Sequence, residues 1–386
     1  MKITKQSRSI TALILAAIAL ASGCSAGAND STGGSVEGRE ALSADLDTFF
    51  VGTDRPLPES GPTSVGAKNV WVLPCTSAAP GCSLPAEAVM EAGTAIGWDM
   101  KMVDGKQDPN TQSNQVRAAV AAGADGLITV AVDCPAISGP LQEAVKGGMK
   151  VMSIYGYDCD NDYTKGESLF SAEMNYGPYE DYSGLVRQGV SRAQAAYISD
   201  IGKTDSESTQ VIAFRQDDVL ATRAVSDGFD ENIKACNCKV ETVTFTGQDL
   251  VGGKLQQKAS AALSRFPEAT VVMAPYDASI LLGIGAAVEQ ARASGRQLTL
   301  TGNEGLPANV KLIEDGVQQF AAGVPTEWAG WAAVDGMNRI FAGQPQVDEG
   351  IGVRSIDKDH PIDCRPFING ACVDFKADYK KIWAVN

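Results

Sequence analysis

The residues able to carry out covalent chemistry are few in this chain. The sole histidine, His360, lies in a proline-flanked charged loop near the C-terminus, whereas a hydrolase triad needs an imidazole or a substitute base. Gly252-Gly253-Lys254 lacks the spacing of a phosphate-binding loop. Carboxylate pairs for glycoside hydrolysis stay open as an alternative, because Asp and Glu occur throughout. The sequence therefore predicts a binding protein rather than an enzyme, with no cofactor.

Polar and aromatic residues follow two apolar runs in the first half of the chain. Asp133 comes directly after residues 126–132, a β-branched run typical of a parallel strand buried on both faces. Tyr155-Gly156-Tyr157-Asp158 follows a second such strand at residues 150–154. In an open α/β sheet, ligands bind beyond the carboxyl ends of the strands. Asp133 and residues 155–158 are therefore predicted to lie close to a ligand.

The elements that position these residues alternate between strand and helix. Asp108 and Pro109 start a helix that ends at Gly123, and a second helix covers residues 135–145 before Gly147. Upstream, strands at 69–73 and 98–103 flank a helix at 85–96. This β-α order with right-handed crossovers predicts a parallel sheet.

The alternation returns after residue 182, in a second half of similar build. A chain of 386 residues exceeds the size at which one core usually stops growing, so we expect two α/β lobes. An amphipathic helix is expected at 327–341. The other expected elements are helices at 182–201, 221–235, 254–264, 279–293 and 308–314, and strands at 210–214, 239–245, 270–274, 297–301 and 318–322.

The net charge of the chain argues against polyanionic partners. The formal net charge is −15, and removal of residues 1–23 takes away Lys2, Lys5 and Arg8, which leaves −18. A surface this acidic argues against binding to nucleic acid or to an anionic membrane. It also has the simpler meaning of a solvated, soluble surface.

Residues 1–23 have the build of a secretory signal. Three basic residues precede an apolar run at 10–21, which is too short to span a bilayer comfortably. Ser22-Gly23-Cys24 resembles the lipobox of bacterial lipoproteins, in which Cys24 would become the lipidated first residue of the mature protein. A plain signal peptide with Cys24 as a bystander is the alternative. Residues 25–40 have the composition of a flexible tether, a short helix is expected at residues 39–50, and the domain is expected outside the cytoplasmic membrane.

The other eight cysteines fall into neighbouring pairs, which predicts disulfides in an oxidising compartment. Eight cysteines allow 105 connectivities, so this pairing rests on proximity alone. A zinc site is disfavoured because the chain has one histidine and no paired C-x-x-C spacing, so no metal is predicted. A bridge across one residue is strained, which makes the third pair the weakest. The pairs are Cys75 with Cys82, Cys134 with Cys159, Cys236 with Cys238, and Cys364 with Cys372.

Residues 68–341 resemble the ribose-binding-protein type of periplasmic solute-binding protein, the receptor component of ABC importers. The resemblance implies two Rossmann-like lobes with parallel sheets, joined by a three-stranded hinge, that clamp a small-molecule ligand by closure. It also implies an ABC permease as partner and a monomeric receptor. The landmarks that carry it, in order, are Asp104 with Asp108, Gln115, Gly123-Ala124-Asp125-Gly126, Asp227-Gly228-Phe229, Pro275-Tyr276-Asp277, residues 301–305, Val324-Pro325 and Ala329-Gly330.

The same resemblance sets the expected domain boundaries. Residues 1–23 are the lipoprotein signal peptide, and residues 24–65 are the lipidated Cys24 and its tether. Residues 66–173 with 324–350 form the N-terminal lobe. Residues 174–323 with 351–386 form the C-terminal lobe.

Ligand contacts are carried over from the family position by position. Tyr155 and Gly156 stand where sugar-binding members have an Asp-Arg pair, and Gly323 replaces a glutamine, so the site departs from that of a simple pentose or hexose receptor. Tyr155, Tyr157, Tyr276, Trp328 and Trp331 offer aromatic faces for stacking or cation–π contact, and half of them are expected in structural roles. The predicted ligand-binding residues are Thr76, Ser77, Asp133, Tyr155, Tyr157, Arg223, Gln248, Tyr276, Asp277 and Glu304.

The leading hypothesis is thus a lipid-anchored ABC receptor for a sugar, polyol or related metabolite. One alternative is a receptor that passes its closed state to a membrane kinase or chemoreceptor, and another is a receptor for a non-sugar metabolite. A cytoplasmic repressor of the same fold is disfavoured by the signal segment and by the absence of an N-terminal helix-turn-helix.

Overall fold

The computed structural model describes residues 36–202, 209–362, 364–368 and 371–386. These residues belong to one compact unit that spans residues 33–386. Cys24 and the predicted signal segment lie outside the described residues. Within the described part of the chain, no helix is long and apolar enough to cross a membrane.

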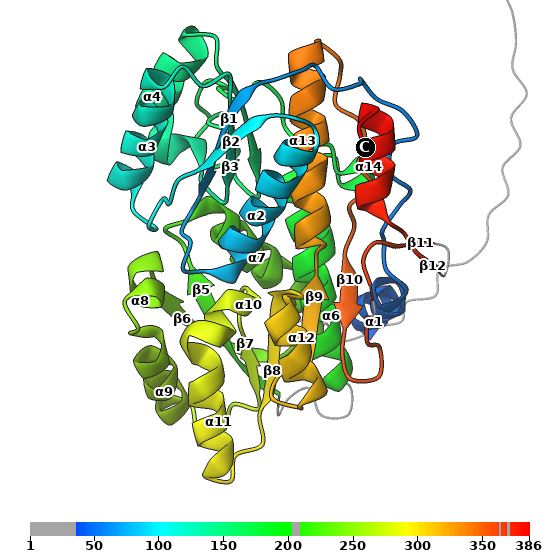
Figure 1. The fold of residues 1–386 in the computed structure, drawn as a ribbon. Helices are drawn as coiled ribbons and strands as arrows, with labels where there is room; N and C mark the ends of the chain where they lie inside the picture. The colour runs from blue at the N-terminus through cyan, green and yellow to red at the C-terminus, as the bar shows by residue number, and fades with distance from the viewer. Residues whose placement is uncertain (1–35, 203–208, 363, 369–370) are drawn as a thin grey trace, which may run out of the picture. The chain divides into compact units, whose positions relative to one another are not determined.

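The first lobe is built on a parallel sheet with strand order β2-β1-β3-β4 (Figure 1). In this sheet Val72 of β1 pairs with Ile128 of β3, and Ile128 pairs with Met152 of β4. Strand β3 therefore lies between two other strands, and all of its residues are buried. The helix at Pro109 begins as predicted, because the Asp108 carboxylate accepts a hydrogen bond from Thr111 N at 2.7 Å. The elements are β1 (Asn69–Pro74), α2 (Pro80–Ala95), β2 (Asp99–Met102), α3 (Pro109–Ala121), β3 (Gly126–Val130), α4 (Cys134–Lys146) and β4 (Lys150–Ile154).

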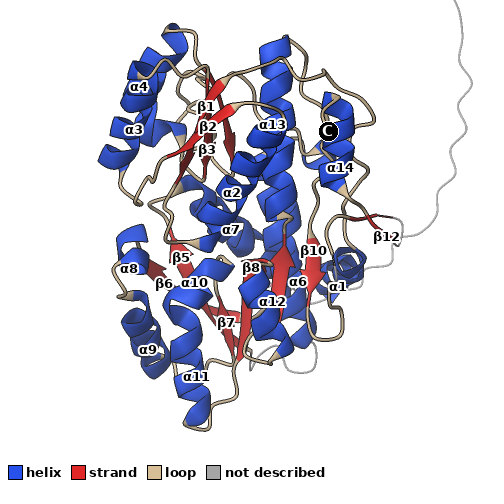
Figure 2. Cartoon of the chain, in the orientation of Figure 1, coloured by secondary structure: helices blue, strands red, loops and turns tan. Residues whose placement is uncertain are grey.

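The second lobe is built on a sheet of order β10-β9-β8-β7-β5-β6, in which only β10 runs antiparallel to its neighbour (Figure 2). Its strands are β5 (Gln210–Gln216), β6 (Lys239–Phe245), β7 (Val271–Met273), β8 (Thr299–Glu304), β9 (Phe320–Gly323) and β10 (Arg354–Ile356). Its helices include α7 (Leu220–Asn232), α8 (Gly247–Val251), α9 (Leu255–Arg265) and α12 (Pro307–Glu314), with a 3₁₀ turn at Ile233–Cys236. The prediction of two α/β lobes with parallel sheets is confirmed.

Two of the predicted helices contain π-helical turns. The expected helix at 182–201 is α5 (Tyr182–Gly184), a π turn at Leu185–Val190 and α6 (Ser191–Ile201), after a 3₁₀ turn at Gly177–Tyr179. The expected helix at 279–293 is likewise α10 (Asp277–Ser279), a π turn at Ile280–Ile284 and α11 (Gly285–Ala293). Such turns inside α-helices are frequent at functional sites.

The chain passes between the two sheets after β4, after β9 and again before β10. Between the second and third of these crossings, α13 (Thr326–Ala342) packs against α2 and β4. Beyond β10 and the small hairpin of β11 (Phe367–Ile368) and β12 (Ala371–Cys372), α14 (Phe375–Trp383) returns to lie beside α13 (Figure 1). The C-terminal helix therefore contacts the helix that covers the first sheet, although its residues were assigned to the other lobe.

Part of the segment expected to be a tether is a packed helix. α1 (Val36–Val51) contacts α6 and β10 of the second lobe. Leu42, Leu46 and Phe49 recur at helical spacing and are buried, which explains why this segment folds onto the domain. Ser43 donates to Asp200 at 2.8 Å, and Asp45 pairs with Arg192.

Candidate functional site

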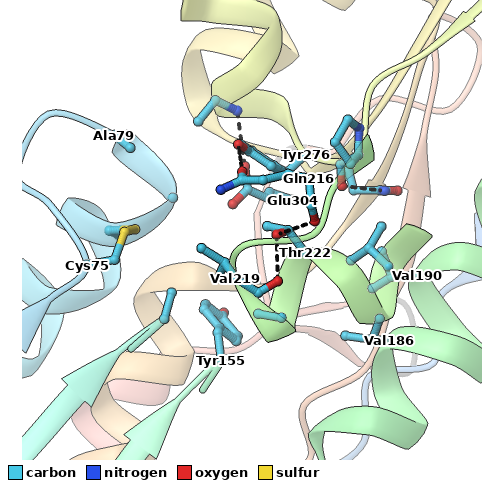
Figure 3. Close-up of a pocket in the computed structure, with 18 of the residues that line it drawn as sticks. Cys75, Ala79, Tyr155, Val186, Val190, Gln216, Val219, Thr222, Tyr276 and Glu304 are labelled. Carbon is cyan, nitrogen blue, oxygen red and sulfur yellow. Dashed lines mark hydrogen bonds between the residues drawn. A yellow bond between two sulfur atoms is a disulfide. The ribbon is translucent and has the colours of Figure 1, made fainter. Parts of the chain in front are cut away.

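A cavity of about 100 Å³ lies between the two lobes, at the carboxyl ends of strands from both sheets (Figure 3). Most of its walls are apolar. From the first lobe it is lined by Cys75, Ala79, Gly81, Cys82, Gln107, Ala131 and Tyr155. From the second lobe and the hinge it is lined by Tyr182, Leu185, Val186, Val190, Gln216, Val219, Ala221, Thr222, Val225, Leu250, Pro275, Tyr276, Ala278, Asn303, Glu304 and Val324.

Glu304 is the one acidic residue among the residues that line the cavity. It ends β8 with a left-handed backbone (φ 93°), and one carboxylate oxygen accepts from Ala278 N at 3.2 Å. Burial, and then the neighbouring Asp277, raise the pKa of Glu304 to about 8. The other oxygen faces the first lobe so closely that a Cβ at Gly81 would lie 2.1 Å from it. The carboxyl group thus sits where the lobes approach each other.

Asp277 holds the turn that carries Glu304. Its side chain accepts from Gly305 N at 2.8 Å, from Leu306 N at 3.2 Å and from the Gln318 amide at 2.9 Å. It is fully buried, and this burial raises its pKa to about 7. Asp277 therefore positions the end of β8 from behind.

Three tyrosines form aromatic walls of the cavity. Tyr155 ends β4 with φ 58°, and its buried hydroxyl has no hydrogen-bond partner in the described structure. Its ring centroid lies 5.5 Å from that of Tyr182. Tyr276 donates its hydroxyl to the Gln216 side chain (Figure 3). Burial raises the pKa of all three hydroxyls above the usual value, so they remain hydrogen-bond donors at neutral pH.

Contacts outside the cavity join the lobes to each other. The Asp133 carboxylate accepts from Tyr157 N in its own lobe at 3.1 Å and from Leu220 N of the second lobe at 2.8 Å. Burial raises the pKa of Asp133 to about 6. Gln248 donates to the Gln107 carbonyl at 3.2 Å across the same gap.

A tyrosine of the first lobe also reaches the second lobe near α7. Tyr163 donates to Asp227 at 3.0 Å and accepts from Arg187 at 3.0 Å. The Arg223 guanidinium lies 4.8 Å from the Tyr163 ring and 3.8 Å from the Asp227 carboxylate. Arg223, predicted as a donor to the ligand, is thus placed in this interlobe cluster and not among the cavity residues.

Of the ten predicted contacts, Tyr155, Tyr276 and Glu304 line the cavity. Asp277 and Asp133 lie behind or beside it, as described above. Thr76 is buried and accepts from Ala78 N at 3.2 Å, whereas Ser77 and Gln248 are exposed. Tyr157 lies in a contact with the Tyr163 and Tyr182 rings.

Several cavity residues were not foreseen from the sequence. Gln216 and Asn303 stand at the ends of β5 and β8, two residues beyond the strand ends predicted, so a longer strand assignment would have found them. The π turn brings Leu185, Val186 and Val190 to the cavity, and no sequence signal marks it. Trp328 and Trp331, considered as stacking faces, lie in the core with at most 1% of their surface exposed.

The structure joins the four cysteine pairs expected from proximity: Cys75–Cys82, Cys134–Cys159, Cys236–Cys238 and Cys364–Cys372. The first pair closes the loop after β1 that lines the cavity. The second joins the start of α4 to the segment after β4. Two bridges therefore restrain the loops at the carboxyl edge of the first sheet, next to the predicted binding region.

Comparisons with known proteins agree with this architecture. An ABC transporter solute-binding protein from Agrobacterium vitis with bound allitol has a TM-score of 0.61 at 17% identity, over 76% of this chain and 97% of its own. The periplasmic arabinose-binding component from Shewanella gives 0.59 at 18% identity, over 81% and 95%. A solute-binding protein from Mycobacterium smegmatis with bound glycerol gives 0.61 at 20% identity, over 76% and 95%.

No curated protein matches the sequence. A model of the periplasmic binding protein domain matches residues 70–345, most of the chain, which confirms the resemblance drawn from the ordered landmarks. Members of this family bind ligands outside the cytoplasm, in keeping with the disulfides. The chain belongs to the family of periplasmic binding protein domains.

Proposed function

We propose that this protein is the solute receptor of an ABC importer and that it binds a small polar ligand, such as a sugar, polyol or related metabolite, in the cavity between its lobes. The observation that carries the proposal is the cavity itself, to which both sheets contribute residues at strand ends. The solved proteins of the same fold that hold allitol, glycerol or arabinofuranose support the ligand class. No catalytic role is assigned.

Binding would proceed by closure of the lobes around the ligand. In the closed arrangement Asp133 caps the N-terminus of α7 in the other lobe, and Tyr163 contacts both Asp227 and Arg187. Glu304 and Gly81 approach closely across the cavity. These contacts hold together only when the lobes are near each other, so they would present one closed surface to a permease.

The signal segment and Cys24 would anchor this receptor to the membrane from outside. The tether that the sequence predicts from residue 25 would join this anchor to the domain, whose first described helix is α1. Residues 66–173 with 324–350 would form one lobe and residues 174–323 with 351–386 the other, except that α14 contacts α13 of the first lobe. In this arrangement the receptor works as a monomer beside its permease.

Thermal unfolding of residues 25–386 against a library of sugars, polyols, nucleosides, amino acids and small amines tests the proposal. A ligand at about a hundred times its dissociation constant should stabilise the protein by about 2.7 kcal/mol. Small-angle scattering with and without the hit then tests closure. A compound that stabilises the protein without changing its radius of gyration would contradict binding by closure. A library in which no compound stabilises the protein would contradict the receptor function.

A further inference from the structure

The cavity is lined by an acidic side chain but by no basic side chain of the described residues. Among the described residues that line it, Glu304 is acidic and none is lysine, arginine or histidine. The groups that face Glu304 from the surrounding elements are Asp277 on α10, Tyr276 and the Tyr155 and Tyr182 hydroxyls, and all of these are acidic or neutral. A buried carboxylate without a cation is costly, so the empty site favours the neutral carboxyl, and a bound cation would stabilise the charged form of Glu304.

Arg365 lies near the cavity but does not line it. Its guanidinium is close enough to Tyr155 to influence the tyrosine hydroxyl; Nη2 forms an ion pair with Asp54 at 2.7 Å, and Nη1 is buried without a hydrogen-bond partner in the described part of the chain. Since no described basic residue lines the cavity, a cation in contact with Glu304 would come from the ligand.

The remaining walls suit an organic cation better than a polyhydroxylated ligand. Tyr155, Tyr182 and Tyr276 surround the space with aromatic rings, and rings attract cations electrostatically. Most of the other lining side chains are apolar, Val186 and Val190 among them, and the neutral polar side chains besides the tyrosines are Gln107, Gln216, Thr222 and Asn303, which are few partners for the hydroxyls of a sugar. Beside Glu304, the Asn303 side-chain oxygen is a buried acceptor without a hydrogen-bond partner in the described structure.

A second hollow next to the cavity is acidic. It is lined by Asp160, Asp162, Glu173 and Asp181, and Tyr182 belongs to the walls of both hollows. Burial, followed by repulsion from Asp158 and Asp181, raises the pKa of Glu173 to about 7. Negative potential focused beside the cavity would raise the local concentration of cations and exclude anions.

We propose that the ligand is a compact organic cation, with its ammonium group against Glu304 and its carbon substituents against the tyrosine rings and the apolar wall. This inference rests on the proposed function and narrows its ligand class. The cation supplies the charge that no lining side chain provides. Closure of the lobes then completes the contact, because the Glu304 carboxylate lies against Gly81 of the first lobe.

Isothermal titration with matched probes tests this inference on residues 25–386. The cationic probes are methylammonium, tetramethylammonium, choline, pyrrolidinium and putrescine. The neutral probes are 3,3-dimethylbutan-1-ol, which has the shape of choline without its charge, together with glycerol and arabinose. We expect at least one cation to bind, and dimethylbutanol to bind far more weakly than choline if choline is that cation.

The variant Glu304→Gln keeps the shape of the side chain and removes its charge. It should weaken cation binding by about 30-fold or more, the usual consequence of removing one partner of a buried charge pair. Glu143→Gln on α4, where the side chain is exposed, is the matched control and should leave affinity unchanged. The unfolding midpoints of the free variants check that both are folded.

The outcomes separate the inference from the function on which it rests. If glycerol, arabinose or another neutral solute binds and the cations do not, the receptor function stands and the inference is overturned. If no cation of the panel binds, the inference is overturned as well. Equal cation affinity in Glu304→Gln and in the wild type also overturns it, because the charge then makes no contact with the ligand.

Discussion

Two regions of this protein bring aromatic rings and buried acids together, yet only one of them leaves a space. The first is the cavity with Tyr155, Tyr182, Tyr276 and Glu304. The second is the contact between α13 and α14, where Trp331 stacks on Trp383 with ring centroids 5.5 Å apart and planes within 4°. Both regions have similar residue types, so the difference between them shows what makes one of them a binding site.

In the α13–α14 contact the acids have partners within the chain. Asp335 pairs with Arg339 at 2.6 Å and accepts from the Trp383 indole at 2.8 Å. Glu349 accepts from the Tyr379 hydroxyl at 2.7 Å, and burial holds the pKa of Glu349 well above its usual value. In the cavity, Glu304 has a backbone N–H as partner and open volume beside it. Glu304 thus differs from the acids of the α13–α14 contact in having cavity volume beside it, and this space makes its carboxyl group available to a ligand.

The largest effect should come from breaking the internal ion pair. Asp335→Asn leaves the buried Arg339 charge uncompensated and should lower the free energy of unfolding by about 3–5 kcal/mol. Glu304→Gln in the free protein should not lower it at pH 7 and should instead raise it, because wild-type Glu304 has to take up a proton to fold at that pH whereas glutamine does not. Denaturant unfolding measures both, and equal losses in the two variants would remove the distinction between the regions.

A smaller loss is expected where an acid positions the site from behind. Asp277→Ala leaves Gly305 N, Leu306 N and the Gln318 amide without their acceptor, which should cost about 2–3 kcal/mol of unfolding free energy. Ligand affinity should fall as well, since the turn that carries Glu304 loses its support. An affinity equal to that of the wild type would show that Asp277 does not position Glu304.

Gly81→Ala tests the close approach of the lobes. The new methyl group would lie 2.1 Å from a Glu304 oxygen, so closure would require the carboxylate to move. We expect affinity for a library hit to fall by about tenfold or more, which is about 1.4 kcal/mol. Gly139→Ala on α4, whose Cβ would meet nothing within 4 Å, is the matched control. Equal affinities of the two variants would argue against this closed arrangement.

Asp133→Ala tests the polar contact between the lobes beside the cavity. It removes the acceptor for Leu220 N and should weaken binding by about tenfold through a shift toward open lobes. This loss of affinity should be limited, because burial disfavours the charged form of the Asp133 carboxylate in the wild type and raises its pKa. Ligand dissociation should accelerate more than association slows, and stopped-flow measurements would detect this. A slower association alone would assign Asp133 a different role.

The pH dependence of the free protein tests the burial of Glu304 in a different way. The folded pKa of Glu304, about 8, exceeds the usual 4.5, so between these values the unfolded carboxyl loses its proton while the folded one keeps it. Stability from this group is therefore present below pH 4.5 and is lost as the pH rises to 8, by at most about 1.4 kcal/mol per pH unit. Glu304→Gln should flatten the unfolding free energy across this window. An unchanged slope would contradict the burial of Glu304.

Much of the architecture could be predicted because it follows local rules. Asp108, Pro109 and Gly123 mark the limits of α3, and the short apolar runs mark the strands. The strand-end rule also located Tyr155 and placed Asp133 at the correct edge of the sheet. The side to which the Asp133 carboxylate turns depends on α7 of the other lobe, and no local pattern specifies that.

The features that the sequence did not predict depend on tertiary packing. The apolar period of a helix continues through Leu185–Val190, so the π turn that brings these residues to the cavity leaves no trace in the sequence. α13 was expected to be amphipathic, but α2, β4 and α14 cover it so completely that Trp328 and Trp331 are core residues. Arg223 matches a family position for a ligand contact, yet its guanidinium lies over the Tyr163 ring and near the Asp227 carboxylate, and Arg223 is not among the residues that line the cavity.

We propose that the cavity between the lobes is the ligand site and that Glu304 contacts the ligand there. Isothermal titration of a library hit into the wild type, Glu304→Gln, Gly81→Ala and the two α4 controls tests this most directly. We predict one binding site, weakened in both cavity variants and unchanged in Glu143→Gln and Gly139→Ala. Wild-type affinity in both cavity variants would contradict the claim and place the ligand elsewhere on the protein.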